Sequence, residues 1–326
     1  MAMKTLIEAL RDGLREEMRR DQRVIVLGED VGLRGGVFLA TDGLYQEFGE
    51  LRVIDTPLAE SSIIGVAIGA AINGLRPVAE MQFADFSAPA MNQIINEAAK
   101  MRYRSQGAYW CPMVIRMPYG DGIHGGPYHS QSVEGIYAHI PGLKVVAPST
   151  PYDVKGLIKS SIRDDDPVIF LEHKKTYRSV KSEIPDNEYL VPIGKAEVKR
   201  PGEDLTVITY GLMLHYCMEA AEMMGKEGVG VEVVDLRTLI PLDKETILNS
   251  VGKTGKALVV YEDNRTAGFG AEIAAMIAEE AFESLDGPVM RLAAPDTPVP
   301  YATTLEDWYM PNPEKILAAM RKLAQY

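Results

Sequence analysis

The 326-residue chain is poor in cysteine, has no excess of positive charge and contains no long apolar run. Its two cysteines, Cys111 and Cys217, are too few for a disulfide framework or a metal cluster, which predicts an intracellular protein. A net charge of −12 argues against nucleic-acid or anionic-membrane binding, because both need a basic face. No run approaches the ~18–20 apolar residues that span a bilayer, and the N-terminus resembles neither a signal nor a transit peptide. We therefore expect a cytoplasmic protein without nucleic-acid or membrane partners.

Complete nucleotide-binding motifs are also missing. The chain has no Gly-x-x-x-x-Gly-Lys-Ser/Thr loop, and the stretch from Gly28 to Gly36 lacks the spacing of the dinucleotide fingerprint. Gly120-Asp121-Gly122 could begin a diphosphate–magnesium motif, but such a motif needs an asparagine pair further along the chain. No Asn-Asn pair occurs. The tripeptide alone predicts a turn.

Helical and strand patterns alternate along the chain. Helical spacing of apolar residues covers residues 5–20, 63–72, 87–104, 152–161, 214–225, 244–251, 270–283 and 313–324. Strand-like runs cover residues 24–27, 52–54, 77–83, 112–117, 142–147, 167–171, 205–210, 229–235, 257–261 and 289–292. This alternation predicts mainly parallel sheets with helices on both faces.

The length of the chain exceeds what one core usually holds, so two domains are expected. The alternation lapses between residues 183 and 194 into Pro, Asp, Asn and Gly, which is typical of a linker. We expect an α/β fold of two doubly wound domains, residues 1–185 and 201–326, joined by a linker over residues 186–200.

The turn at residues 55–62 joins a short strand to an apolar, glycine-containing helix. Parallel α/β folds bind ligands at such turns, at the carboxyl ends of strands. Glu60 lies there, beside a helix that is too apolar for an ordinary surface helix. A carboxylate next to so much apolar sequence needs a partner or a functional role.

A glycine-rich loop at residues 117–132 contains His124 and His129. Glycine allows close backbone approach to a ligand, and histidine can transfer protons near neutral pH. A metal pair is conceivable, but no carboxylate-rich partner motif at ligand spacing accompanies the histidines. Local sequence leaves both a plain surface role and a catalytic role open.

Two further turns have alternative interpretations. Gln82 and Phe86 flank a strand end, where an amide and an aromatic ring could hold a flat heterocycle, although Phe86 could equally be a core residue. The run Asp164-Asp165-Asp166 could be a solvated acidic turn or could bind a hard cation through its backbone carbonyls.

Taken together, the chain resembles the β subunit of the E1 component of 2-oxo acid dehydrogenase complexes over its whole length. The segments that carry the resemblance occur in the same order as in that family: residues 27–31, 55–61, 74–80, 82–86, 128–132, 141–146 and 235–238. The resemblance implies a thiamine-pyrimidine-binding domain followed by a transketolase C-terminal domain. It also implies an α2β2 assembly in which the cofactor lies between an α and a β subunit.

The resemblance implies a set of site residues. Glu60 contacts N1′ of the aminopyrimidine of thiamine diphosphate, and the rest of that pocket consists of Glu29, Leu58, Ala59, Gln82 and Phe86. His129 is the active-site histidine and contributes to substrate binding with Phe86 and Ser87. The turn with Ser161, Asp164 and Asp166 matches a loop whose carbonyls bind a structural K⁺ ion. The α subunit supplies the Gly-Asp-Gly…Asn-Asn site for the diphosphate and Mg²⁺, which accounts for its absence here.

By the same resemblance, the enzyme decarboxylates a 2-oxo acid and reductively acylates the lipoyl group of an E2 acyltransferase. Residues 128–132 and 294–302 look closer to branched-chain members than to pyruvate members, which favours 3-methyl-2-oxobutanoate. Other stretches are shared with β subunits of pyruvate and acetoin dehydrogenases. A pocket distinguishes two substrates that differ by one methylene by only ~1–3 kcal/mol of binding free energy, so a few substitutions could change the substrate class.

Two alternatives lie outside this class. A non-catalytic scaffold that docks E2 should have lost its key residues, whereas Glu60 and His129 are present. A self-sufficient transketolase-like enzyme should carry the asparagine pair, which is missing.

Overall fold

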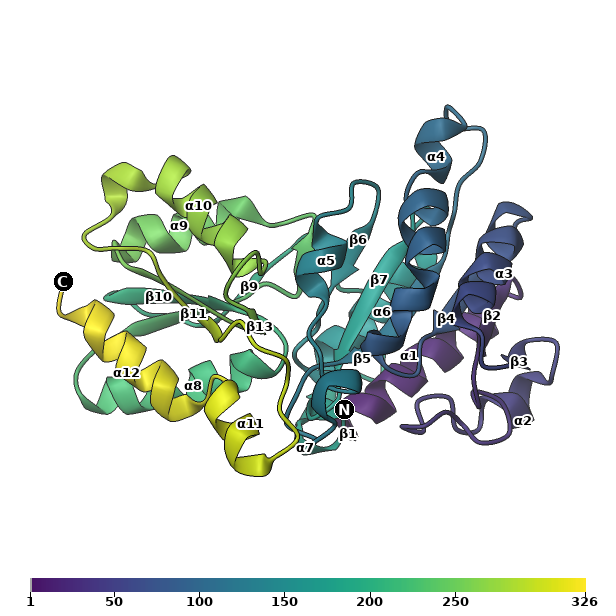
Figure 1. Ribbon diagram of the computed structural model, residues 1–326, viewed down its shortest axis with the longest axis horizontal. Coiled ribbons are helices and arrows are strands. Elements are labelled where there is room, and N and C mark those ends of the chain that lie inside the picture. Colours follow the sequence, from purple (N-terminus) through teal and green to yellow (C-terminus); the bar gives the residue numbers. More distant parts are fainter. Residues whose placement is uncertain (1) are drawn as a thin grey trace. The chain divides into compact units, whose positions relative to one another are not determined.

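The computed structural model describes residues 2–326, and Figure 1 shows their helices and strands. The chain forms two compact units. The first comprises the chain up to Tyr119 together with Ile136–Ile193, and the second comprises Gly120–Gly135 together with Gly194–Tyr326. One change of unit falls inside the short helix α5 (Glu134–Ala138). The chain therefore enters the second unit twice.

A parallel sheet forms the centre of the first unit, with its strands in the order β6-β7-β5-β4-β2-β3. These strands are β2 (Val24–Gly28), β3 (Val53–Asp55), β4 (Arg76–Glu80), β5 (Val114–Tyr119), β6 (Lys144–Val146) and β7 (Val168–His173). In this register Gly28 lies opposite both Asp55 and Glu80. The segments that follow β2, β3 and β4 therefore leave the sheet side by side at its carboxyl edge.

Helices α1 (Leu6–Arg20) and α6 (Pro151–Arg163) pack against each other and share a core with Val26, Val78 and Phe170 of the sheet. Helix α1 begins where Thr5 and Glu8 form a capping box, which satisfies two free N–H groups of the first turn. Helix α3 (Glu60–Ile72) packs against β2 and β4. The smaller elements of this unit are β1 (Ala2–Thr5), α2 (Leu44–Phe48), α7 (Thr176–Ser179) and β8 (Lys181–Ile184), and β1 pairs with β8 antiparallel.

The continuous helix expected over residues 87–104 is wrong. The structure has a 3₁₀ helix, η1 (Ala84–Ala90), then a π-helical turn, η2 (Gln93–Ala98), and a short α4 (Met101–Arg104). Pro89 lies inside η1 and has no N–H to donate. Nothing in the sequence explains the π-helical turn and the break before α4.

The second unit has its own sheet, in the order β14-β13-β10-β11-β9. All its neighbouring strands are parallel except β9, which pairs with β11 antiparallel. Figure 1 shows α8 and α12 on one face of this sheet and α9 and α10 on the other. The elements are η3 (Gly126–Tyr128), β9 (Glu197–Arg200), β10 (Leu205–Thr209), α8 (Leu212–Lys226), β11 (Val231–Asp235), β12 (Thr238–Ile240), α9 (Lys244–Thr254), β13 (Ala257–Asn264), α10 (Gly270–Glu280), η4 (Phe282–Ser284), β14 (Met290–Ala294), α11 (Thr303–Tyr309) and α12 (Pro313–Ala324).

The expected α/β class is confirmed, because each unit is built on a mainly parallel sheet covered by helices. The domain bounds 1–185 and 201–326, and the linker over 186–200, stay a prediction. Within that expected linker, Val191 is buried in the core of the first unit and β9 joins the sheet of the second.

Candidate active site

Glu60 is the first residue of α3, directly after the turn that follows β3. This turn is tied to the end of β2, because the Thr56 N–H donates to the Gly28 carbonyl at 2.9 Å. It is also tied to the next loop, because the Gly32 N–H donates to Asp55 Oδ1 at 2.6 Å. The free N–H groups of a first helical turn favour a carboxylate there. The fold thus holds Glu60 at a defined point on the carboxyl edge of the sheet.

Glu29 follows β2, the strand next to β3, and lies near Glu60. Burial raises the pKa of Glu29, and the charges of Glu60 and Asp30 raise it further. Two carboxylates therefore act on the same region of the edge. A hydrogen-bond donor or a shared proton between them would relieve the repulsion.

The segment after β4 supplies an amide and aromatic rings. Gln82 and Phe86 are half-buried, and the Phe86 ring meets the Phe83 ring edge-to-face with centroids 5.4 Å apart. Ser87 is buried, and its hydroxyl donates to the Ala84 carbonyl at 2.5 Å. The strand order β3-β2-β4 thus places Glu60, Glu29 and Gln82 on three successive turns.

One side of this group is uncovered in the single chain. The Leu58 side chain is 77% exposed and Ala59 is half-buried, just before Glu60. On α3 itself, Val66 is 61% exposed, and a Cβ atom at Gly65 would meet nothing within 4 Å. The helix that looked too apolar for a surface is therefore buried on one side only.

His129 belongs to the second unit, in the glycine-rich loop between β5 and α5. The base of this loop is closed by a hydrogen bond from the Gly120 N–H to the Gln131 carbonyl at 3.2 Å. His129 ends the turn η3, and its N–H donates to the Gly126 carbonyl at 3.3 Å. The other residues expected for cofactor and substrate lie in the first unit.

The acidic turn after α6 is held by two cationic side chains. Arg76 Nη1 donates to the Asp164 carbonyl at 2.8 Å, and Lys144 Nζ donates to both Asp164 carboxylate oxygens at 2.7 and 2.6 Å. The Ser161 carbonyl accepts from the Asp164 N–H at 3.3 Å, and the Asp166 N–H donates to Asp164 Oδ1 at 2.9 Å. Each carbonyl keeps a second lone pair that a K⁺ ion could use, although Lys144 already balances the Asp164 charge.

A buried ionic cluster in the first unit was missed from the sequence. Arg116, Glu80 and Glu172 are all buried and form ion pairs across β4, β5 and β7. Tyr177 completes the cluster by donating to Glu172. The available signal was a charged residue inside two apolar strand patterns, Glu80 and Arg116, and one directly after a third, Glu172, because such residues must be paired when buried.

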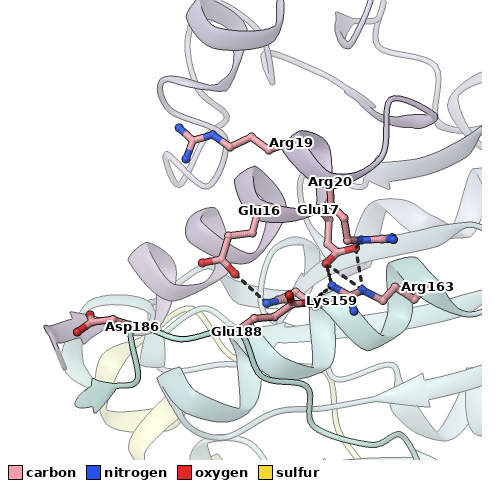
Figure 2. Close-up of a pocket in the computed structure, with 8 residues that line it drawn as sticks. All are labelled: Glu16, Glu17, Arg19, Arg20, Lys159, Arg163, Asp186 and Glu188. Atoms are coloured by element: carbon pink, nitrogen blue, oxygen red, sulfur yellow. Dashed lines mark hydrogen bonds and ion pairs between the residues drawn. The ribbon is translucent and has the colours of Figure 1, made fainter.

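Figure 2 shows a surface cavity of ≈ 320 Å³ in the first unit, lined by charged side chains of α1, α6 and the segment after β8: Glu16, Glu17, Arg19, Arg20, Lys159, Arg163, Asp186 and Glu188. Glu17 accepts from Arg20 and Arg163, and Glu16 accepts from Lys159. Acids and bases are equal in number here and largely neutralise one another. We therefore assign no ligand to this cavity, whose ion pairs link α1 to α6.

Residues 2–326 contain neither a metal-ligand cluster nor a membrane-spanning helix. No three His, Cys, Asp or Glu side chains in that range are grouped as metal ligands would be. No helix in the same range is long and apolar enough to cross a membrane.

The chain matches two protein families. Residues 2–180 match the transketolase pyrimidine-binding domain, and residues 194–316 match the transketolase C-terminal domain. Among solved structures, it is similar to a split-gene transketolase described as an inactive β4 tetramer, with a TM-score of 0.81, 23% identity and 98% of each chain covered. At that identity the structural likeness shows the fold alone.

Curated relatives are much closer in sequence. The chain is 58% identical to the 2-oxoisovalerate dehydrogenase subunit beta of Bacillus subtilis over the full length of both chains. It is 51% identical, again over both full lengths, to the pyruvate dehydrogenase E1 component subunit beta of the same organism. It is also 49% identical to the corresponding pyruvate dehydrogenase subunit of Staphylococcus aureus.

Proposed function

Because the chain belongs to the family of E1 component β subunits of 2-oxo acid dehydrogenases, we propose that it is the β subunit of a thiamine-diphosphate-dependent E1 acting on branched-chain 2-oxo acids. Its substrate is of the 3-methyl-2-oxobutanoate type, and the acyl group passes to the lipoyl group of an E2 acyltransferase. The higher identity to the 2-oxoisovalerate enzyme than to the pyruvate enzyme, 58% against 51%, favours the branched-chain substrate.

The observation that carries this proposal is the convergence of Glu60, Glu29, Gln82 and Phe86 on neighbouring turns of one sheet edge. Their chemistry fits an aminopyrimidine, since carboxylates meet ring nitrogens and amino groups while an aromatic ring and an aliphatic side chain cover its faces. When bound, thiamine diphosphate supplies a carbon nucleophile that attacks the 2-oxo carbon and accepts the electrons released with carbon dioxide.

Glu60 holds a proton at N1′ of the pyrimidine in this proposal. A proton held between Glu60 and that nitrogen would favour the imino tautomer of the ring, which has given up one proton of its exocyclic amino group and would therefore be basic at that nitrogen. The charge of Glu60 contributes to the raised pKa of Glu29, so the two carboxylates lie close together. Leu58 and Ala59 form the apolar wall before the helix.

His129 serves the substrate side, with Phe86 and Ser87. An imidazole can orient the 2-oxo acid and transfer a proton to the opening dithiolane of the lipoyl group. The glycine-rich loop gives it close approach to both partners.

The proposed assembly is an α2β2 heterotetramer. The exposed side of Glu60, Leu58 and α3 is what a β subunit would present if the α subunit completes the cofactor site. The diphosphate and Mg²⁺ would then be held mainly by the α subunit. The turn with Ser161, Asp164 and Asp166 is the proposed K⁺ site.

The test is reconstitution of this chain with its α subunit, thiamine diphosphate and Mg²⁺, followed by decarboxylation of 3-methyl-2-oxobutanoate and of pyruvate. We expect the branched-chain acid to have the higher kcat/KM. A clear preference for pyruvate would support the second candidate, a pyruvate dehydrogenase E1 β subunit, and turnover of acetoin would support an acetoin dehydrogenase. Activity of the β subunit alone would contradict the shared site.

A further inference from the structure

The glycine-rich loop is bound to the second unit through its backbone. Glu306 of α11 accepts hydrogen bonds from the Gly122 N–H at 3.1 Å and the His124 N–H at 3.0 Å. Glu262 of β13 accepts one from the Asp121 N–H and a longer one, at 3.4 Å, from the Ser132 hydroxyl. Two carboxylates therefore hold the backbone from Asp121 to His124, and one of them also binds Ser132.

Both carboxylates are buried, with Glu306 1% and Glu262 3% exposed. Burying a carboxylate is costly unless its oxygens accept strong hydrogen bonds. Here three of the donors are backbone amides of a loop whose glycines would otherwise leave it mobile. The Ser132 hydroxyl also donates to Glu262, and the His124 imidazole contacts Glu306. Two buried carboxylates that accept the loop's amides are expected if the loop must keep one conformation.

We propose that Glu306 and Glu262 are positioning residues, which fix the loop from Gly120 to Gln131, and with it His129, by accepting its backbone amides. The consequence for catalysis rests on the proposed function, because it requires His129 to act on the substrate. The effect on the loop itself does not depend on the proposed function.

Asp121 completes the arrangement. Its side chain is buried, and its Oδ1 accepts from the Gly122 N–H at 2.8 Å. Burial, followed by the interaction with Glu306 and the nearby charge of Glu262, raises its pKa to about 8. A protonated Asp121 can donate to the ionised Glu306, so the two acids share one proton. The other titratable groups around Asp121 and Glu306 are Tyr309 from α11, Glu262 and Asp263 from β13, Glu134 from α5, and His124 from the loop.

This arrangement makes loop docking depend on pH. The ordinary pKa of Asp121 is 3.8 and the docked value is about 8, so the docked loop binds the extra proton. Asp121 therefore favours docking most below pH 3.8, favours it less as pH rises through that window, and changes nothing further above about pH 8. Glu306, whose pKa is lowered, acts in the opposite direction, because it is protonated and weakens docking as pH falls below 4.5.

Hydrogen–deuterium exchange on the full chain tests the positioning role without requiring activity. We expect Glu306→Ala to abolish the protection of the Gly122 and His124 amides, after correction for intrinsic exchange rates. Glu306→Gln should restore most of it, because its side-chain carbonyl can still accept both amides. Asp307→Ala, an exposed neighbour on the same helix, is the matched control and should change nothing. Unchanged protection in Glu306→Ala would overturn the proposal.

Kinetics of the reconstituted E1 tests the consequence. We expect Glu306→Ala to lower kcat on the order of 10²-fold, as a small misplacement of a reacting group does, with rescue in Glu306→Gln. Asp121→Asn should flatten the fall in loop protection between pH 6 and 8. Increased exchange with unchanged kcat would overturn the positioning role. If the wild type turns over no 2-oxo acid, the proposed function fails while the exchange result still decides the loop.

Discussion

Arg116 donates from Nε and Nη2 to the two carboxylate oxygens of Glu172, each at 2.6 Å, in the middle of the first sheet. The same guanidinium also donates to Glu80, so two buried carboxylates share one cation. Glu172 additionally accepts from the Tyr177 hydroxyl at 2.5 Å. Burial raises the pKa of Glu80, although the charge of Arg116 opposes the shift. Glu172 therefore forms the bidentate ion pair with Arg116, whereas Glu80 is the acid whose pKa is raised.

We expect Glu172→Gln to lower the free energy of unfolding by about 3 kcal/mol, because it breaks a buried bidentate ion pair. Glu80→Gln removes the surplus acid and should change it by less than about 1 kcal/mol. In the wild type, the folded state keeps the Glu80 proton more tightly, so stability should fall as pH rises above 4.5, the ordinary pKa of Glu80. Urea unfolding of both variants and the wild type at two pH values measures these changes. An equal loss of unfolding free energy in the two variants would contradict the unequal roles of Glu172 and Glu80.

Glu60→Gln should abolish most of the proposed activity while leaving the assembly intact. Loss of a positioned proton donor typically lowers kcat by about 10²–10⁴-fold. The exposed Glu50→Gln, on the chain just before β3, is the matched control. Steady-state decarboxylation and sedimentation of the mixture with the α subunit measure both effects. Full activity of Glu60→Gln would remove the role assigned to this carboxylate.

Gly142 and Gly74 separate backbone strain from steric clash. Their φ values are +99° and +97°, but a Cβ at Gly142 would lie 2.0 Å from the Ala99 carbonyl oxygen, whereas one at Gly74 would meet nothing within 4 Å. In both alanine variants the left-handed conformation should lower the free energy of unfolding by about 1–2 kcal/mol. Gly142→Ala should lose a further 1–3 kcal/mol or so from overpacking. Thermal unfolding of the pair measures the difference, and equal Tm values would refute the clash.

The two thiols should be inert in the native chain. Burial raises the pKa of Cys111 to about 12 and also raises the pKa of Cys217. At pH 8 only roughly one Cys111 in ten thousand is a thiolate, the reactive form. We expect a chromogenic disulfide reagent to react at least about 100-fold faster after unfolding in urea than before. Rapid release of one equivalent from the folded protein would show that a thiol is accessible.

Local sequence patterns were sufficient for most of the regular elements. The strand expected at 24–27 is β2, the helix expected at 313–324 is α12, and the turn that carries Glu60 leads directly into α3. Such elements follow from apolar periodicity and from capping residues near the chain position itself. The α/β class follows from their alternation.

Features that depend on distant partners could not be obtained in this way. Strand β8 lies at the start of a stretch that resembles a linker, and it forms because β1 pairs with it from the other end of the unit. Nothing near Arg116 in the sequence indicates its partners: Glu80 lies opposite it in the register of the sheet, and Glu172 lies two residues beyond Phe170, which is opposite it on β7. Likewise, nothing near Asp121 in sequence indicates that it pairs with Glu306.

The second unit is encoded by two separate segments of the gene, so it cannot be transferred or excised as a single fragment. A fragment starting at Gly194 would leave Glu262 and Glu306 without the amides that they accept, and Tyr210 without the Glu134 carboxylate to which its hydroxyl donates at 2.9 Å. Recombination that exchanged only the C-terminal half between relatives would transplant these acids without the loop that matches them. Selection should therefore act on both halves together, although each has its own hydrophobic core.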